Sequence, residues 1–390
     1  MTDWPVKTLG DICEVFDDGD WIESKDQASS GVRLIQTGNV GEGEFKDRSD
    51  KARFISELTF SRLRCTEIIP GDLLVSRLPD PVGRACLIPD TGSKMITAVD
   101  CTIMRPRKDI MLPQFLVSST QTSGYREQVR AKITGTTRDR ISRSKLAEVQ
   151  VSVPPLEEQK RIVELLDAAT ARVTELTACF EQARTHANDL FTSALREELE
   201  SNSDWPVKKL GELLTVQNGY AFDSKHFSPG GKIGLIRIRD LKGGVSTETR
   251  YDGPYAEEFI VSAGDYLIGM DGEFHCYEWK GDPALLNQRV CRLQGFGKSL
   301  EPRFLFYGIN KFLKDIEDVT GYTTVKHLSS KSILAIEMPV PPLEEQKQIV
   351  ARLDSMRAKT SEMVAAYDAK LTAAKNLRQS ILESAFAGDL

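Results

Sequence analysis

The chain has 390 residues, of which 40% are hydrophobic and 28% charged, and its formal net charge is −6. This length exceeds what one hydrophobic core usually serves, and the composition excludes a disordered or fibrous protein, so we expect at least two globular domains. The negative charge argues against binding of nucleic acid through bulk electrostatics, and without an apolar run of membrane-spanning length or a leader sequence the chain is expected to be cytoplasmic, with no membrane contact.

Two segments of the chain occur twice. The segment DWPVKTLGDI begins at Asp3 and returns at Asp204 with seven identities in ten, and VPPLEEQKRIVELLD begins at Val153 and returns at Val340 with twelve identities in fifteen. The stretches between them differ in length and sequence. We interpret this as a pseudo-two-fold internal repeat in which a common scaffold carries two modules with different surfaces; drift after an old gene duplication is the alternative. The chain then divides into residues 1–153, a first module; 154–203, a central helical segment; 204–340, a second module; and 341–390, a C-terminal helical segment.

Each module is expected to be a compact, mixed α+β domain, because short strand-like runs alternate with Gly, Asn, Asp and Pro turns and a few helical stretches. Strands are expected within Ile68–Ser76, Ile233–Arg239 and Ala263–Met270. On the second of these runs Arg237 and Arg239 would share one face of a strand, where they could contact phosphates.

The last part of the first module is a basic segment. Tyr125–Lys145 carries seven basic residues against two acidic ones and includes the sequence GTTRDR at Gly135–Arg140. Small hydroxylated residues beside guanidinium groups are suited to clamping phosphate or reading guanine edges, although a solvated basic surface is the alternative. The candidate DNA-binding residues of the first module are Arg77, Arg126, Arg130, Lys132, Thr136, Thr137, Arg138, Arg140, Arg143 and Lys145.

The second module has a comparable concentration of recognition-type side chains. The expected loop Met270–Trp279, MDGEFHCYEW, follows a strand, and Gly321–Lys326 corresponds by position to the basic loop of the first module. Loops of this composition commonly carry binding residues. The candidates of the second module are Arg237, Arg239, Asp271, Glu273, His275, Tyr277, Tyr322, Thr323 and Lys326.

The two helical segments are expected to be long helices that pair with each other. Each follows a proline pair and places two glutamates in its first turn, where carboxylates meet the positive end of the helix dipole. Apolar residues then recur in heptads, with an interruption at Lys370 in the second copy. The alternative is that each helix packs on its own module. The expected helix-pair interface consists of Ile162, Leu166, Val173, Leu176, Phe180, Leu190, Ile349, Leu353, Met356, Met363, Tyr367, Leu377 and Ile381.

Sequence motifs of catalysis are absent. The chain lacks the motifs of serine hydrolases, zinc proteases and P-loop nucleotide-binding proteins, and its seven cysteines are scattered, which favours reduced and mostly buried thiols. Its four histidines are too dispersed for a metal cluster. We therefore expect a binding protein rather than an enzyme, with no metal and no cofactor of its own. A stand-alone enzyme that modifies or cleaves DNA and a structural coiled-coil adaptor are the alternatives.

The whole chain resembles the DNA specificity subunit of type I restriction-modification systems. The resemblance is carried by W-x-x-x-x-L-G at Trp4 and Trp205, G-D-[LY]-L at Gly71 and Gly264, and P-P-L-E-E-Q-x-x-I-V-x-x-L-D at Pro154 and Pro341.

This resemblance implies a fold, a function and partners. The fold would be two target recognition domains joined by two long helices that form an antiparallel coiled coil. Each domain would read one half of a bipartite site in double-stranded DNA, and the helices would set the spacer between the halves. The helices would also dock the methyltransferase subunits, expected to be two. Restriction subunits would complete the complex, and S-adenosylmethionine, ATP and magnesium would be bound by the partner subunits.

Overall fold

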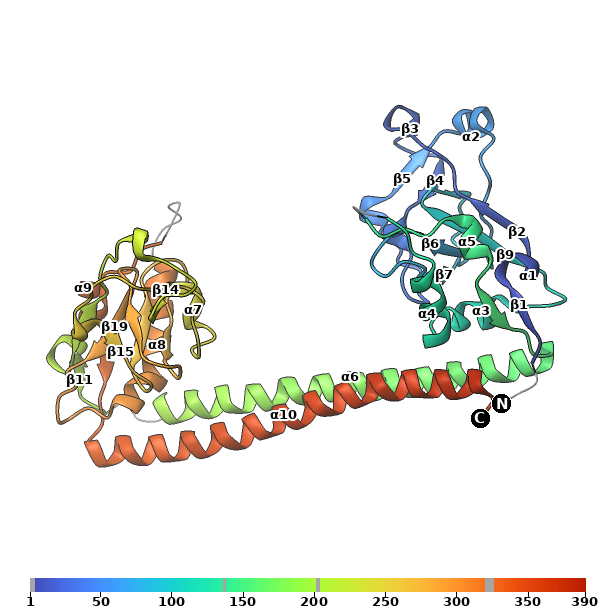
Figure 1. Ribbon diagram of the computed structural model, residues 1–390. Helices are drawn as coiled ribbons and strands as arrows, with labels where there is room; N and C mark the ends of the chain where they lie inside the picture. Colours follow the sequence, from blue (N-terminus) through green and yellow to red (C-terminus); the bar gives the residue numbers. More distant parts are fainter. Residues whose placement is uncertain (1–3, 136–137, 201–203, 320–325) are drawn as a thin grey trace. The chain divides into compact units, whose positions relative to one another are not determined.

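The computed structural model describes residues 4–135, 138–200, 204–319 and 326–390. The chain forms two compact units, one of Met1–Gln182 with Tyr367–Leu390 and one of Ala183–Ala366. Each unit contains one module together with part of each long helix (Figure 1). The boundaries between the units therefore fall within the long helices.

The first unit contains two four-stranded sheets, with strand orders β2-β9-β6-β7 and β3-β5-β4-β8, and a two-stranded ribbon β1-β10. Its strands are β1 (Val6–Thr8), β2 (Cys13–Asp18), β3 (Gln27–Ala28), β4 (Val32–Ile35), β5 (Arg53–Ile55), β6 (Leu73–Ser76), β7 (Ala85–Leu87), β8 (Met95–Thr97), β9 (Cys101–Pro106) and β10 (Gln150–Ser152). Its shorter helices are α1 (Leu9–Ile12), α2 (Glu57–Leu63), α3 (Pro113–Ser119), α4 (Ser123–Ala131) and α5 (Arg143–Ala147).

The second unit repeats this arrangement with sheets β12-β19-β16-β17 and β14-β13-β18-β15 and a ribbon β11-β20. Its strands are β11 (Val207–Lys209), β12 (Thr215–Asn218), β13 (Ile233–Ile236), β14 (Arg250–Tyr251), β15 (Ile260–Val261), β16 (Tyr266–Gly269), β17 (Cys276–Glu278), β18 (Ala284–Leu286), β19 (Val290–Gln294) and β20 (Glu337–Pro339). Its shorter helices are α7 (Ile238–Leu241), α8 (Pro302–Val319) and α9 (Ser330–Leu334). Short 3₁₀ helices occur at η1 (Ser24–Asp26), η2 (Thr37–Asn39), η3 (Ser49–Lys51), η4 (Leu210–Glu212), η5 (Ser224–His226) and η6 (Glu257–Phe259).

The two modules agree in one sheet and differ at an edge of the other. The first sheet has the same all-antiparallel pairing in both, with β2, β9, β6 and β7 equivalent to β12, β19, β16 and β17. In the second sheet a parallel pair, β4 with β8 or β13 with β18, is common to both. The added edge strand is β3 beside β5 in one module and β15 beside β18 in the other. In the first unit, Figure 1 shows β3, β5 and α2 at the end farthest from the long helices.

The G-D-[LY]-L motif begins the third strand of each first sheet, and its aspartate forms an ion pair with the neighbouring strand. Asp72 is 1% exposed and receives hydrogen bonds from the Arg105 guanidinium at 2.7 and 2.8 Å. In the second module the Arg292 guanidinium lies 3.0 Å from Asp265. Both aspartates also accept a backbone N–H three residues earlier in the chain, which fixes the turn before the strand.

We expect Asp72→Asn to lower the free energy of unfolding by about 2 kcal/mol, because it removes the charge that compensates a largely buried guanidinium. Urea denaturation measures this loss. The matched change Asp265→Asn is expected to cost less, because the Arg292 guanidinium keeps hydrogen bonds to Gln217 and to the carbonyl oxygen of Ile260. Equal costs at the two positions would contradict the uncompensated guanidinium as the cause.

The long helices are α6 (Leu156–Glu200) and α10 (Leu343–Ala387), and each begins directly after its proline pair, as the sequence predicts. In the first unit Ile162 and Leu166 of α6 share a core with Leu382 and Ala385 of α10. Farther along α6, the Phe180 ring lies 6.5 Å from the ring of Tyr367. Residue numbers rise along one helix as they fall along the other, so the two helices pack antiparallel.

The predicted helix interface is wrong at four positions. Leu176, Leu190, Met363 and Leu377 are 40 to 49% exposed. In each heptad a second inward residue follows the first by either three or four residues. The side on which the partner helix lies decides between these two spacings, three plus four or four plus three. The structure takes the second division at three of these positions, so the less exposed residues there stand one position later, at Thr177, Phe191 and Val364. After Leu377 the less exposed residue is Gln379, two positions later.

The same shift removes the expected interruption of the second seam. Leu371, 9% exposed, occupies the inward position that the sequence pattern assigns to Lys370. The Lys370 ammonium instead lies over the rings of Phe180 and Tyr367, at 5.5 and 5.2 Å from their centroids. The lysine thus covers aromatic side chains of the helix pair and keeps its charge near solvent.

All seven cysteines are free, and only Cys179 is exposed. Burial raises the pKa of the Cys13 and Cys86 thiols to about 12, so these groups remain protonated. None of the described helices is long and apolar enough to cross a membrane.

Candidate nucleic-acid interface

The basic loop of the first module projects from a short β-bridge. The backbone N–H of Thr134 donates to the carbonyl oxygen of Arg140 at 2.8 Å, and the Arg140 N–H donates back at 3.0 Å. Gly135 has φ +139, and a Cβ there would collide with the carbonyl oxygen of Arg138, so the turn requires glycine. Ile141, which is fully buried, anchors the end of the loop. Thr136 and Thr137, at the predicted tip, lie outside the described residues.

Much of the positive charge of Tyr125–Lys145 is neutralised within the first unit. The ion pairs are Arg126 with Glu42 at 2.7 Å, Lys132 with Glu148 at 3.0 Å, Arg140 with Asp100 at 3.2 Å, and Arg143 with Asp17.

Three basic residues of this segment, Arg130, Arg138 and Lys145, make no ion pair with any residue that the structure describes. Arg130 and Arg138 are also exposed. Free positive charge is thus confined to fewer positions than the sequence indicates, and Arg138 is the one that lies on the projecting loop.

Arg77 does not fit its predicted role at a DNA surface. It directly follows β6 and is only 4% exposed, with its guanidinium donating to the Val99 carbonyl oxygen and lying 3.4 Å from Asp18. Its Nε is buried without a hydrogen-bond partner among the described residues. Burial lowers the pKa of this guanidinium. The sequence pattern cannot separate a structural arginine at the end of a strand from an exposed one.

In the second module much of the predicted loop Met270–Trp279 belongs to the core. Cys276–Glu278 forms β17, which pairs with β16, and Phe274, Cys276 and Trp279 are at most 2% exposed. The hydrophobic side chains in this segment pack inward, which leaves a shorter loop with Asp271 and Glu273 at its surface.

This shorter loop is tied to the segment after residue 325. Asp271 forms an ion pair with Arg289 at 3.4 Å and a contact with the His327 ring at 2.8 Å. The Gly272 N–H donates to the carbonyl oxygen of Lys326 at 3.2 Å. The Lys326 ammonium donates to the carbonyl oxygen of Glu317 at 2.7 Å, which draws its charge toward the end of α8. Tyr322 and Thr323 lie outside the described residues.

His275 and Tyr277 form a half-buried pair beside this loop. Their ring centroids are 4.6 Å apart, and the Nε2 of His275 lies 3.2 Å from the side-chain nitrogen of Asn310. Burial lowers the pKa of His275 and so favours its neutral form. A neutral imidazole beside a phenol offers hydrogen bonds and a stacking face, but no phosphate-attracting charge.

The strand predicted for Ile233–Arg239 ends at Ile236, so Arg237 and Arg239 do not share a strand face. Arg237 precedes α7, where its N–H donates to the Asp240 carboxylate at 2.8 Å. This local bond stabilises a helix start instead of further strand. Both arginines are nevertheless exposed, and Arg239 donates to the Thr249 hydroxyl at 3.2 Å.

Sequence reasoning missed two buried glutamines that join each module to its helix. Gln159 accepts from the Leu112 N–H and donates to two backbone carbonyl oxygens, all at 2.8 Å. Gln346 makes the equivalent three bonds, at 2.8, 2.9 and 2.8 Å. Both are fully buried. The repeated sequence VPPLEEQK contains the signal, since a polar side chain that returns unchanged at the same position of both helix starts is a candidate for a buried role.

Among the described residues, no group of three or more His, Cys, Asp or Glu side chains is placed to hold a metal ion.

Comparisons with known proteins agree on one family. The model of the type I restriction modification DNA specificity domain matches residues 1–182 and 202–373. The EcoBI specificity subunit of Escherichia coli is 34% identical over 209 residues, which are 51% of this chain and 44% of that protein. The StySPI specificity subunit of Salmonella potsdam is 26% identical over 321 residues, with 74% of this chain and 68% of that protein covered. The chain thus matches less than half the length of the first of these relatives.

Two solved structures share the fold. A chain described in work on complex assembly and conformational transition of the type I R-M system has a TM-score of 0.81 at 21% identity, with 99% of this chain and 98% of that chain covered. The HsdS subunit from Thermoanaerobacter tengcongensis has a TM-score of 0.60 at 20% identity, with 100% and 98% covered.

Proposed function

The chain belongs to the type I restriction modification DNA specificity family, and we propose that it is the DNA-reading subunit of a type I restriction-modification enzyme. The observation that carries this proposal is the combination of a repeated scaffold with unlike surfaces. The proline-glutamine helix starts, the aspartate-arginine pairs and the first sheets recur in both units, whereas the edges of the second sheets and the loops differ. Two modules with different surfaces on one repeated scaffold are suited to bind a DNA site with two unlike halves.

In this proposal each module binds one half of a bipartite site in double-stranded DNA. Phosphate contacts fix the register of the module on the duplex, and a few contacts to base edges determine the sequence. In the first module the free guanidinium of Arg138 supplies such a contact. In the second module, exposed Arg237 and Arg239 are candidates for phosphate, and the loop with Glu273 is a candidate for base edges.

The long helices set the spacer between the half-sites and dock two methyltransferase subunits, to which restriction subunits are added. The chain itself is non-catalytic. S-adenosylmethionine, ATP and magnesium belong to the partner subunits, and the complex works in the cytoplasm, where the DNA is. The comparisons do not support a stand-alone DNA-modifying enzyme, since the relatives named above are specificity subunits.

The test of this function is substitution at the projecting loop. We expect Arg138→Ala to weaken binding at one half-site by about tenfold or more, since a good base or phosphate contact contributes about 1–3 kcal/mol. Binding is measured with duplexes in which one half or the other is scrambled. Arg107→Ala, at an exposed arginine outside the basic segment, is the matched control and should bind as the wild type. Equal weakening at both half-sites would refute the assignment of one module to one half-site.

A further inference from the structure

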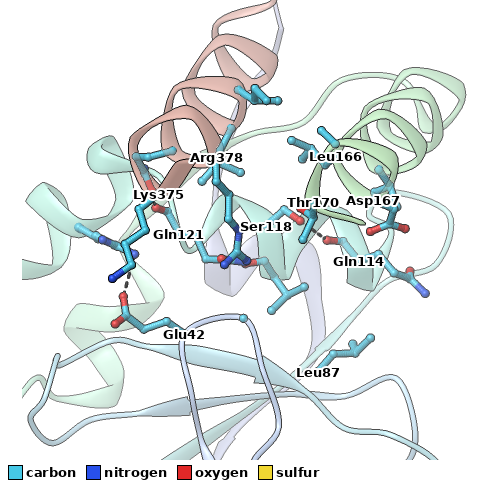
Figure 2. A pocket seen from close by; sticks show the side chains of 18 residues that line it. Glu42, Leu87, Gln114, Ser118, Gln121, Leu166, Asp167, Thr170, Lys375 and Arg378 are labelled. Carbon is cyan, nitrogen blue, oxygen red and sulfur yellow. Dashed lines mark hydrogen bonds and ion pairs between the residues drawn. The ribbon is translucent and has the colours of Figure 1, made fainter. Parts of the chain in front are cut away.

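A cavity of about 510 Å³ lies in the first unit, between the module and the two long helices. Figure 2 shows that its walls differ in charge. Asp167 and Thr170 of α6 lie on one side, whereas Lys375 and Arg378 of α10 lie on the other. Glu42, which also lines it, is already paired with Arg126. Asp167 is exposed, and its carboxylate has neither a hydrogen bond nor an ion pair with a side chain in the described part of the chain.

The second unit shows what occupies the equivalent space there. The buried glutamines fix the correspondence, because Gln159 binds the N–H of Leu112 just before α3 and Gln346 binds that of Glu301 just before α8. Both helices then start with proline and place Phe-Leu at the same two buried positions. Asp167 corresponds to Asp354 in the repeated helix start.

Asp354 is held by side chains of its own module. The Arg303 guanidinium donates Nε to the two carboxylate oxygens at 2.7 and 2.9 Å, and the Tyr307 hydroxyl donates to the same group. The Arg357 guanidinium lies over the Phe306 ring, 5.8 Å from its centroid. In this unit the carboxylate has an intramolecular guanidinium and phenol as partners.

In the first unit each of these side chains is replaced by a smaller or uncharged one. The residues that correspond to Arg303, Phe306, Tyr307, Met356 and Arg357 are, in that order, Gln114, Val117, Ser118, Ala169 and Thr170. All five line the cavity. The cavity of the first unit therefore takes the place of the arginine and tyrosine side chains of the second unit. The aspartate that those side chains bind is retained in the first unit as Asp167.

We propose that this cavity is a docking pocket for a protein partner that inserts an arginine side chain against Asp167. The second unit is the template, since it shows a guanidinium on the equivalent carboxylate, with aromatic side chains beside it. Lys375 and Arg378 on the opposite wall require that the same partner segment present a neutral or acidic side chain to α10. The proposal rests on the proposed function in one respect, because the partner we assign is a modification subunit.

The pocket makes the two halves of the repeat unequal. The equivalent position of the second unit is filled by its own residues, so an inserted arginine can be accepted in the first unit only. A complex with two modification subunits would then hold one of them through a contact that the other lacks.

The experiment fills the pocket with the residues of the second unit. The double variant Gln114→Arg with Ser118→Tyr gives Asp167 an intramolecular partner. We expect it to fold, to melt at a higher temperature than the wild type, and to bind one of its two modification subunits at least tenfold more weakly. Native mass spectrometry and titration of the purified chain with modification subunits from the same organism measure stoichiometry and affinity.

A second variant, Asp167→Asn, keeps the cavity open and removes only the charge, so it should weaken the same binding step even if the double variant fails to fold. Glu164→Gln, at an exposed acid three residues earlier on α6, is the matched control and should bind as the wild type. Two modification subunits bound with wild-type affinity by Asp167→Asn would overturn the pocket. A wild-type chain that binds no modification subunit would instead overturn the proposed function.

Discussion

Gln159→Met is expected to lower the free energy of unfolding of the first unit by at least about 3 kcal/mol. Methionine has nearly the volume of glutamine, so the change leaves packing almost intact and removes only hydrogen bonds. The change removes the hydrogen bonds of Gln159 to the Leu112 N–H and to the carbonyl oxygens of Ile110 and Pro154, around a fully buried site. Each buried polar group without a partner costs about 1–3 kcal/mol.

This loss is measured by urea denaturation and, locally, by hydrogen exchange of the Leu112 amide, which should lose protection first. The matched change Gln346→Met should do the same at the Glu301 amide of the second unit. Gln182→Met, at an exposed position on α6, controls for the change in residue type. If Gln159→Met and Gln182→Met cost the same, the three bonds of Gln159 contribute nothing net.

The bonds of Gln159 also matter for the proposed function, because they attach a DNA-reading module to its long helix. Gln159 is the fourth residue of α6, the long helix to which α3 is attached, so its three bonds fix the angle between module and helix. A shift of that angle would displace every DNA contact of the module together. We therefore expect partially destabilised Gln159 variants to lose discrimination between spacer lengths before they lose discrimination between bases.

The scaffold was predictable from sequence because its signals are local and occur twice. A proline pair permits helix only after it, and a repeat of twelve identities in fifteen can be recognised without knowledge of the fold. The phase of the helix interface was not predictable, because Leu176 and Thr177 satisfy the same heptad, and only the position of the partner helix distinguishes them.

The candidate site was predictable as a region and not as a set of residues. The density of basic residues in Tyr125–Lys145 is visible in the sequence. The acidic residues that pair with Arg126 and Arg143 are Glu42 and Asp17, which lie far away along the chain. Arg237 was misplaced for the opposite reason, because a local bond to Asp240 ended the strand. Long-range pairing and local capping both override alternation of residue types.

Removal of one helical turn from each long helix is expected to shorten the preferred spacer of the DNA site by about two base pairs. Four residues span about 6 Å of helix, and DNA rises about 3.4 Å per base pair. Thr174–Thr177 of α6 and residues 370–373 of α10 lie opposite each other in the antiparallel pair of the first unit, between the level of buried Val173 and Ala374 and the ring contact of Phe180 with Tyr367. Their joint deletion keeps the helix partners matched.

The spacer preference is read by selection from DNA pools that carry both half-sites at random separations. The half-site sequences should remain those of the wild type, because both modules and their glutamine attachments are intact. Deletion from α6 alone is the control: it misaligns the two helices and should broaden the spacer preference instead of shifting it. An unchanged spacer preference in the double deletion would mean that the helices do not set the separation of the half-sites. That separation would then have to be determined by the modules or by the partner subunits.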